Sequence, residues 1–366
     1  MSIAHRVLGE PGRDNLLRVD VNAGATILRL QLDCGERCLD ALAKSTLKAT
    51  DHLFFSHLHM DHVGGFDTFF RANFERGGRP VSVWGPPGTA AILHHRFRGF
   101  LWNIVGDAPG TWIVHDVHED HARRRRFEAR EAFATAHPLE PVGHAGTIVE
   151  TPECTVAALA LPHHGVSLAY LVRETPRLVV DRARLAASGL APGPWLGALK
   201  DAASGAGRDA AARTLDVGGA RRDARELADA LLVAAPRESI AYVTDFLLDE
   251  AVHARLVPWL RGVDTLVCES QYHPDEAALA RRNHHATIDR VASLARAAEV
   301  GTLVPFHLSE RYERREREAM LALARERFPA TSYPPHWDSG DVACTEGGNV
   351  TGSTPRKRAT TSARRR

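Results

Sequence analysis

The sequence lacks the features that mark several classes of protein. Its five cysteines form no Cys-x-x-Cys pair and are odd in number, so a disulfide framework is not expected and a reducing compartment fits better. Charge of one sign is not in excess, because 46 Lys and Arg oppose 45 Asp and Glu, so global charge does not indicate a nucleic-acid-binding protein. No apolar run approaches the ~18–20 residues of a membrane span, and the N-terminus has no apolar signal core. We therefore expect a cytoplasmic protein without a membrane segment.

Short apolar runs alternate with helical patterns along the 366 residues. This alternation predicts a layered α/β domain. Thr287 lies at the start of a helix predicted at 287–299 and could cap it. Strands are predicted at 25–33, 53–55, 81–84, 155–161, 240–243, 265–268 and 302–306, and helices at 223–234, 287–299 and 315–327.

Two segments differ from this pattern. Residues 174–221 are rich in glycine and carry only a weak helical signal near 181–187, which is typical of a functional arm or a disordered insert. The C-terminal end is basic and rich in Ser and Thr, so we expect it to be disordered. We divide the chain into a domain at 1–345, with an arm-like insertion at 174–221, and a disordered basic tail at 346–366.

A dense group of possible metal ligands follows the predicted strand at 53–55. His57, His59, Asp61 and His62 lie within six residues, and imidazole and carboxylate groups suit zinc-like ions. In a turn that leaves a strand, His57 and His59 can point toward one ion while Asp61 and His62 turn toward a second. Such spacing should arise by chance on the order of once in a hundred chains of this composition.

Three other apolar runs also end in residues that can bind metals. The run 155–161 is followed by His163 and His164, the run 240–243 by Asp245, and the run 302–306 by His307. Open α/β sheets place their sites at the carboxyl ends of strands. We therefore expect these residues to converge on the 57–62 turn.

This ordered set resembles the motifs of the metallo-β-lactamase superfamily, and further segments resemble the ribonuclease Z family. The resemblance runs in order over roughly residues 27–330. The segments that carry it are Leu-Asp-Cys-Gly-Glu at 32–36, Gly-Leu-Ala-Pro-Gly-Pro-Trp-Leu at 189–196, Glu-Ser at 269–270, His-Ala-Thr at 285–287 and His-Leu-Ser-Glu-Arg-Tyr at 307–312.

The resemblance implies a four-layer αββα sandwich that holds two zinc ions, with manganese as an alternative. His164 remains an alternative to His163: the family's interval to a following tyrosine, here Tyr170, favours His163, but His-Gly-Val at 164–166 resembles the family more closely. The implied ligands are His57, His59 and His163 for one ion, Asp61, His62 and His307 for the other, and Asp245 as the bridge.

The implied activity is a ribonuclease Z-type phosphodiesterase that acts on the 3′ end of a tRNA precursor, in a protein that could form a homodimer. A hydroxide shared by the two ions would attack phosphorus, and Asp61 would orient it and accept its proton. His285 would act as general acid, oriented by Glu269; alternatively it is a helix-start histidine that faces solvent. Ser309 and Arg311 would bind a substrate phosphate; alternatively Arg311 forms an ion pair with Glu310 or Glu313.

A second reading keeps the fold and changes the substrate. The positive charges of the arm are scattered, at Arg182, Arg184, Lys200 and Arg208, whereas a tRNA-binding arm should concentrate them. This favours a small-molecule hydrolase that cleaves a cyclic nucleotide, lactone, thioester or sulfate ester. A nonenzymatic RNA- or partner-binding relative is disfavoured, because no ligand position is lost.

Overall fold

The computed structural model describes residues 2–23, 26–40, 42–204 and 214–339. The tail predicted at 346–366, and Arg208 of the arm, lie outside the described residues. Among the described residues two large sheets face each other. In the first sheet the strands lie side by side in chain order: β1 (Ser2–Leu8), β2 (Leu16–Asn22), β3 (Ile27–Leu32), β4 (His52–Phe54), β5 (Val81–Gly85), β6 (Thr111–Val117), β7 (His121–Glu128) and β8 (His137–Gly143).

The second sheet is built mainly from the later part of the chain. Parallel pairing joins β16, β17 and β18, and antiparallel pairing joins β16 to β11 and β11 to β10. Its spatial order is β18 (Thr302–Phe306), β17 (Thr265–Glu269), β16 (Ser239–Val243), β11 (Val166–Glu174), β10 (Cys154–Pro162) and β9 (Thr147–Glu150).

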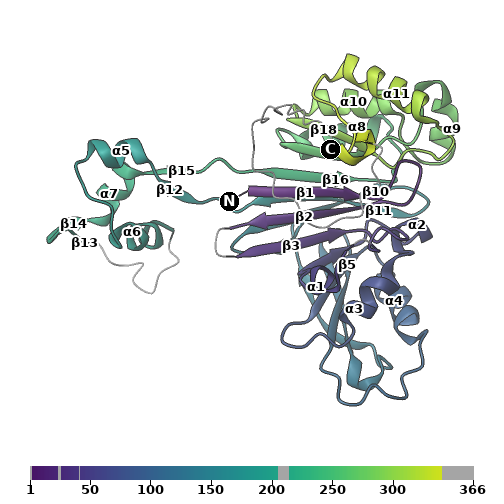
Figure 1. Ribbon diagram of the computed structural model, residues 1–366, viewed down its shortest axis with the longest axis horizontal. Helices are drawn as coiled ribbons and strands as arrows, with labels where there is room; N and C mark the ends of the chain where they lie inside the picture. The colour runs from purple at the N-terminus through teal and green to yellow at the C-terminus, as the bar shows by residue number, and fades with distance from the viewer. Residues whose placement is uncertain (1, 24–25, 41, 205–213, 340–366) are drawn as a thin grey trace, which may run out of the picture.

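Helices cover the outer face of each sheet, which completes the predicted αββα sandwich (Figure 1). The first sheet carries α1 (Lys44–Lys48), α2 (Met60–Val63), α3 (Phe66–Asn73) and α4 (Thr89–Arg98). The second carries α8 (Glu250–Leu260), α9 (Ala277–Arg282), α10 (Ile288–Ala297) and α11 (Arg314–Arg327), followed by α12 (Pro335–Ser339). Short 3-10 turns occupy Ala129–Glu131 and Pro274–Glu276.

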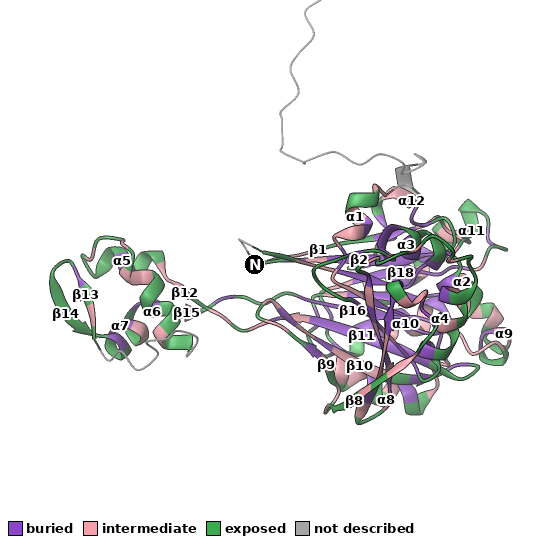
Figure 2. Ribbon diagram, turned by 90° about the horizontal axis from the view of Figure 1, so that it is seen from below, coloured by how far each residue is buried: buried purple, intermediate pink, exposed green. Residues whose placement is uncertain are grey.

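Three apolar clusters correspond to these layers, and Figure 2 shows buried segments running through the sandwich. The aromatic rings of α3 pack with Trp112 beneath the first helical layer. Leu256, Leu294 and Met320 pack beneath the second helical layer. Tyr170 lies between the two sheets with residues of both. Burial of both faces explains why β4, β16 and β18 read as continuous apolar runs.

The predicted elements agree with the structure, with two local differences. Thr287 occupies the N-cap position of α10, but its hydroxyl donates to Asp289 Oδ1 (2.7 Å) and makes no bond to the helix backbone. The helix predicted at 223–234 ends earlier, as α7 (Ala224–Leu231), because 232–234 pair as a strand. No helix in the described part of the chain combines the length and apolar character needed to cross a bilayer.

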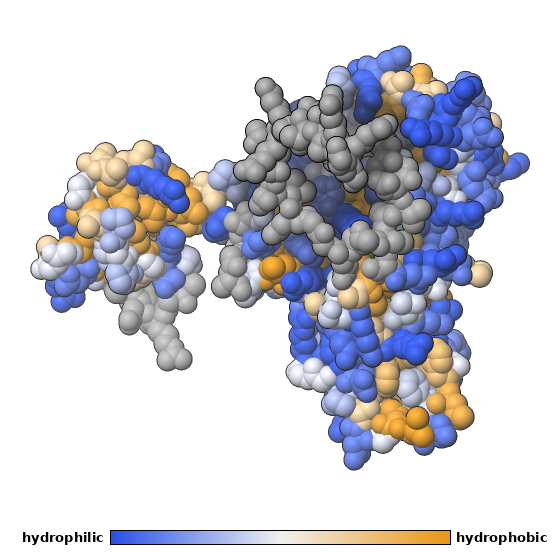
Figure 3. Space-filling model, viewed as in Figure 1, coloured by the Kyte–Doolittle hydropathy of each residue, from blue (hydrophilic) through white to orange (hydrophobic). Residues whose placement is uncertain are grey.

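A small lobe stands apart from the sandwich at the end of a two-stranded ribbon (Figure 1). The ribbon pairs β12 (Leu178–Val180) with β15 (Leu232–Ala234), so the excursion extends beyond the predicted 174–221. Figure 3 shows apolar surface gathered on this lobe. The lobe contains α5 (Arg182–Ala187), α6 (Trp195–Ser204), α7 and the hairpin of β13 (Thr214–Val217) and β14 (Ala220–Asp223), and its own core is formed by Leu185, Leu199, Val217, Leu227, Leu231 and Leu232.

Candidate metal centre

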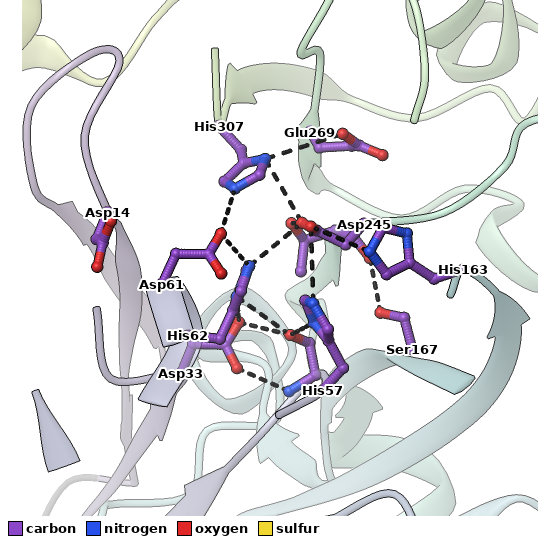
Figure 4. A network of polar contacts seen from close by, with 12 residues as sticks. Asp14, Asp33, His57, Asp61, His62, His163, Ser167, Asp245, Glu269 and His307 are labelled. Atoms are coloured by element: carbon purple, nitrogen blue, oxygen red, sulfur yellow. Dashed lines mark hydrogen bonds and ion pairs between the residues drawn. The ribbon is translucent and has the colours of Figure 1, made fainter. Parts of the chain in front are cut away.

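Strand ends from both sheets meet at one edge of the sandwich. The turn after β4 carries His57 and His59, and α2 begins at Met60, so that it presents Asp61 and His62. From the second sheet, His163 follows β10, Asp245 follows β16 and His307 follows β18. Figure 4 shows most of these side chains pointing toward a common centre.

The predicted ligand residues fall into two groups. The ligand atoms of His57, His59 and His163 lie within 4.8 Å of one another. Those of Asp61, His62, Asp245 and His307 form a second group by the same measure. Residues more than a hundred positions apart in the chain thus converge as their strand-end positions predicted.

Asp245 lies between the two groups. Its Oδ2 is 3.7 Å from His57 Nε2 and 3.8 Å from His163 Nε2, while its Oδ1 is 3.4 Å from His62 Nε2 and 3.5 Å from His307 Nδ1. One carboxylate oxygen therefore faces each group. This is the arrangement that a bridging ligand requires.

Backbone strain accompanies this convergence. Asp33, Asp245 and His307 have φ values of 63°, 50° and 52°, in the left-handed region that residues other than glycine seldom adopt. Such conformations cost of order 1 kcal/mol or more each and cluster at functional sites, where the surrounding structure holds them. At these positions the surrounding structure keeps the backbone in a strained conformation, and the side chains converge as a result.

Three of the histidine rings are positioned by contacts of their Nδ1 atoms on the side away from the centre. His62 Nδ1 donates to Asp33 Oδ2 (2.8 Å), His57 Nδ1 lies 3.2 Å from Ser56 Oγ, and His163 Nδ1 donates to the carbonyl oxygen of His284 (3.1 Å). These contacts leave the Nε2 atoms directed at the centre. Outer hydrogen bonds of this kind set the tautomer and orientation of metal-binding histidines.

Asp33 is the functional residue that sequence reasoning missed. It is fully buried, and besides His62 it accepts hydrogen bonds from Ser56 N, Ser56 Oγ and Tyr242 OH at 2.7–2.8 Å. The segment 32–36 contributed to the family resemblance, but the sequence around Asp33 has no spacing that indicates its partner. Only the pairing of β3 with β4 brings it behind His62.

The centre contains polar atoms that the protein alone leaves unsatisfied. The buried Nε2 atoms of His57 and His62 and the Nδ1 atom of His307 have no hydrogen-bond partner among the described residues. Buried polar atoms are otherwise nearly always paired. Unpaired imidazole nitrogens aimed at clustered carboxylates are a donor set that fits a divalent cation.

The histidines of the centre differ in the direction in which their pKa values are shifted. Burial, reinforced by neighbouring His62, lowers the pKa of His57 to about 2, and burial lowers that of His163 to about 4. Burial alone would also lower the pKa of His307, but the carboxylates of Asp245 and Asp61 raise it to about 10. His57 and His163 therefore present neutral rings, as metal ligation requires. The carboxylates of the second group attract positive charge, which a divalent cation would supply.

His285 and Glu269 form a pair beside the centre. His285 Nδ1 donates to Glu269 Oε2 (2.8 Å), and Glu269 Oε1 accepts from Phe246 N (3.0 Å). The Glu269 side chain is fully buried, and that of His285 is 11% exposed, so this histidine does not face open solvent. Burial opposes the charged ring, but Glu269 outweighs it and raises the pKa of His285.

Ser309 lies beside the centre and contacts Arg311, whose ion-pair partner was not predicted. Ser309 lines an open pocket of about 260 Å³, together with Asp61, His307 and Arg13. Arg311 Nε donates to Ser309 Oγ (3.1 Å), and its Nη1 pairs with Glu276 Oε1 (2.7 Å). Its ion-pair partner is therefore neither Glu310 nor Glu313.

The structure separates the two adjacent histidines after β10. His163 is buried and belongs to the first ligand group. His164 is exposed and stands outside the ligand groups found among the described residues. Its ring stacks instead on that of His284, with a centroid distance of 4.7 Å.

Comparison with known proteins shows which sequences this chain resembles. The chain is 46% identical over 334 residues to a ribonuclease Z of Deinococcus radiodurans, which covers 91% of this chain and 98% of that protein. It is 29% identical to a ribonuclease Z of a Synechococcus strain over 88% of this chain and 91% of that protein. The family model described as anti-Pycsar protein Apyc1 matches residues 21–122.

A solved structure supports the fold. The metallo-β-lactamase fold protein YhfI from Bacillus subtilis superposes with a TM-score of 0.53 at 12% identity, covering 91% of this chain and 96% of that one. At this level of identity the likeness bears on the fold alone, and it agrees with the αββα layers described above.

Proposed function

The chain belongs to the ribonuclease Z family, and from this membership we propose that it cleaves tRNA precursors at their 3′ ends with the help of two zinc ions. The observation that carries the proposal is the 46% identity to a ribonuclease Z across 91% of the chain. The two groups of metal-ligand side chains at one edge of the sandwich support it. The protein is accordingly a metal-dependent hydrolase with a metallo-β-lactamase fold.

The donor atoms support a two-ion arrangement. His57, His59 and His163 would hold one ion, and Asp61, His62 and His307 the other, with Asp245 between them; zinc is favoured because five of these seven residues are histidines, with manganese as the alternative. When bound, two such ions supply a water of lowered pKa and neutralise charge on the phosphoryl group.

Asp61 is proposed to position the attacking water and accept its proton. Its Oδ2 lies 3.2 Å from His62 Nε2 and 3.4 Å from His307 Nε2, which fixes the carboxylate at the centre. Its side chain is 40% exposed and borders the open pocket. A carboxylate in this place reaches both the buried groups and an incoming substrate.

His285 is proposed to protonate the leaving oxygen. Its Nδ1 is engaged by Glu269, so Nε2 is the atom left to face the substrate. Glu269 acts as a positioning residue, since its two oxygens are held by His285 Nδ1 and Phe246 N. A fully buried carboxylate held on both sides gives the imidazole a single orientation.

Ser309 and Arg311 are proposed to bind a phosphate next to the scissile bond. The guanidinium lies over the Tyr272 ring at 5.3 Å and donates to Ser309, and both of these partners line the pocket beside Asp61 and His307. Its ion pair with Glu276 is an exposed one, which costs little to exchange for a phosphate.

The decisive experiment is incubation of the metal-loaded protein with a 3′-extended tRNA precursor. We expect one cleavage at the 3′ end, close to two metal ions per chain, and a loss of about 10²–10⁴-fold in kcat for Asp61→Ala. Asp40→Ala serves as the matched control, because Asp40 is an exposed aspartate that pairs with Arg37.

Failure to cut the precursor alongside good turnover of bis(p-nitrophenyl) phosphate would favour the small-molecule hydrolase. A metal-free preparation that remained fully active would contradict the dizinc proposal. Sedimentation of the same preparation tests the homodimer that the family suggests.

A further inference from the structure

Two stacked imidazole rings lie at the exposed rim of the metal centre. The rings of His164 and His284 are nearly parallel, at 10°, with centroids 4.7 Å apart. His164 is exposed and His284 is half-buried, so His284 covers one face of a ring that remains accessible to solvent. The proposed hydrolysis uses neither ring.

The protein holds this stack in one position. His284 Nδ1 donates to the carbonyl oxygen of His163 (2.6 Å), and His163 Nδ1 donates back to the carbonyl oxygen of His284 (3.1 Å). His284 also has a φ of 57°, a conformation that the surrounding structure must maintain. The His284 ring is therefore hydrogen-bonded to the backbone of His163, which is a proposed metal ligand.

The stack adjoins the place where the scissile phosphate would bind. The His164 ring lies 4.8 Å from the His163 ring and 6.3 Å from the His59 ring, centroid to centroid. Both neighbours belong to the first ligand group, whereas neither His164 nor His284 joins any ligand group found in the described part of the chain. The pair thus offers a flat surface beside the metal centre and no ligand position of its own.

A flat, solvent-accessible ring that is held in place by a second ring suits a nucleobase. Single-stranded RNA is recognised largely by stacking of unpaired bases on aromatic rings, histidine included, and stacking tolerates any base because each has a π-face. We propose that His164, backed by His284, stacks on the base of a nucleotide that flanks the scissile phosphodiester. This inference rests on the proposed RNA substrate and adds a substrate-positioning surface to it.

The test is a double-mutant cycle in which the His164 ring is removed from the protein and a base is removed from the RNA, separately and together. Wild type, His164→Ala and His164→Phe are loaded with zinc and assayed on a 3′-extended tRNA precursor. The same precursor is also made with an abasic ribose on either side of the cleavage site. For His164→Ala we expect KM for the intact precursor to rise about five- to tenfold, the lower end of the range for loss of a stacking ring. His164→Phe should restore it.

The abasic substrate distinguishes stacking from a structural role. For wild type, one of the two abasic precursors should raise KM by a similar factor, and on that substrate His164→Ala should add no further loss. Metal content per chain should be the same in all variants, since His164 is not a proposed ligand. His253→Ala, a half-buried histidine on α8, is the matched control and should leave KM unchanged.

Additive effects of the protein and RNA changes would overturn the inference, as would an unchanged KM in His164→Ala. Loss of metal from His164→Ala would also overturn it, because that result would make His164 a ligand. If wild type cleaves the intact precursor, only the stacking surface is in question. If it does not, the proposed function fails and this inference with it.

Discussion

Asp33 controls the geometry of the metal centre without pointing into it. Its carboxylate holds His62 Nδ1 and accepts three further hydrogen bonds while fully buried. A carboxylate–imidazole contact of this kind decides which ring nitrogen remains free for a cation. The residue explains why the buried Nε2 of His62 is directed at the centre, where it has no hydrogen bond among the described residues.

We predict that Asp33→Asn lowers metal affinity about 10- to 100-fold. Asparagine tolerates the left-handed backbone at this position, but its neutral amide holds His62 Nδ1 less firmly. Affinity is measured by competition with a coloured chelator. Tyr242→Phe is the control, because it removes one donor to the same oxygen and leaves the carboxylate; equal affinities of Asp33→Asn and wild type would refute the role of Asp33.

A second prediction concerns His115, which lies away from the proposed ligands in β6. Burial, with a smaller contribution from Arg124, lowers its pKa to about 4, and its ring stacks on Trp84. His52 is the other titratable group that faces it. Between pH 6.5 and 4 the unfolded chain therefore binds a proton more readily than the folded one, and stability falls as pH is lowered through this window.

At pH 5 this single group should cost about 2 kcal/mol relative to pH 7.5. The measurement is the free energy of unfolding in urea at both pH values for wild type and His115→Gln. Glutamine can still donate to Val83 O, as His115 Nδ1 does, but does not titrate. The variant should lose less stability on acidification than wild type does, and equal losses would show that His115 is not the cause.

At the scale of elements, the β12–β15 ribbon separates the lobe from the sandwich. The ribbon begins where Ala235 N donates to Arg177 O (3.0 Å), so the two ends of the excursion lie side by side. Among the residues that the structure describes, the core of the lobe shares no buried residue with the three clusters of the sandwich. Contacts that stabilise the lobe are therefore local to it.

We predict that the lobe can be deleted without unfolding the sandwich. Joining Arg177 to Ala235 through an Asn-Gly turn removes the lobe together with the ribbon, at a point where the two chain segments already lie side by side. The melting temperature and the turnover of bis(p-nitrophenyl) phosphate should change little. KM for a tRNA precursor should rise at least about tenfold and depend less steeply on salt, if the lobe contacts phosphates. Unchanged precursor kinetics would mean that the lobe does not bind RNA.

Across the whole molecule, the metal centre connects the two sheets. His57, Asp61 and His62 follow β4 of the first sheet, whereas His163, Asp245 and His307 follow strands of the second. A cation that binds these residues together binds only the folded chain. Its binding free energy therefore adds to the stability of the sandwich.

Removal of metal should consequently lower the free energy of unfolding. At a free metal concentration about a thousand times the dissociation constant, the loss is about 4 kcal/mol. Thermal unfolding is followed before and after treatment with dipicolinate, and again after zinc is restored. A variant without the bridging carboxylate, Asp245→Ala, should show a much smaller response; an equal response would place the stabilising ion elsewhere.

The layered fold and the set of candidate ligands could be predicted from local patterns. Continuous apolar runs marked the buried strands, and ligand-type residues directly after them had to lie at the same edge of the sandwich. The spacing of His57, His59, Asp61 and His62 carried the strongest signal. For the strands and the ligand spacing, each short segment of sequence by itself indicates where it lies in the fold.

Other features depended on contacts between distant segments. His163 and His164 are adjacent, and only the course of the chain after β10 turns one inward and leaves the other stacked on His284. The partner of Asp33 and the pairing of Arg311 with Glu276 join segments that carry no shared pattern. The lobe closes at Ala234 because β15 pairs with β12. Side-chain direction and partner choice were decided by packing between elements, which no single stretch of sequence encodes.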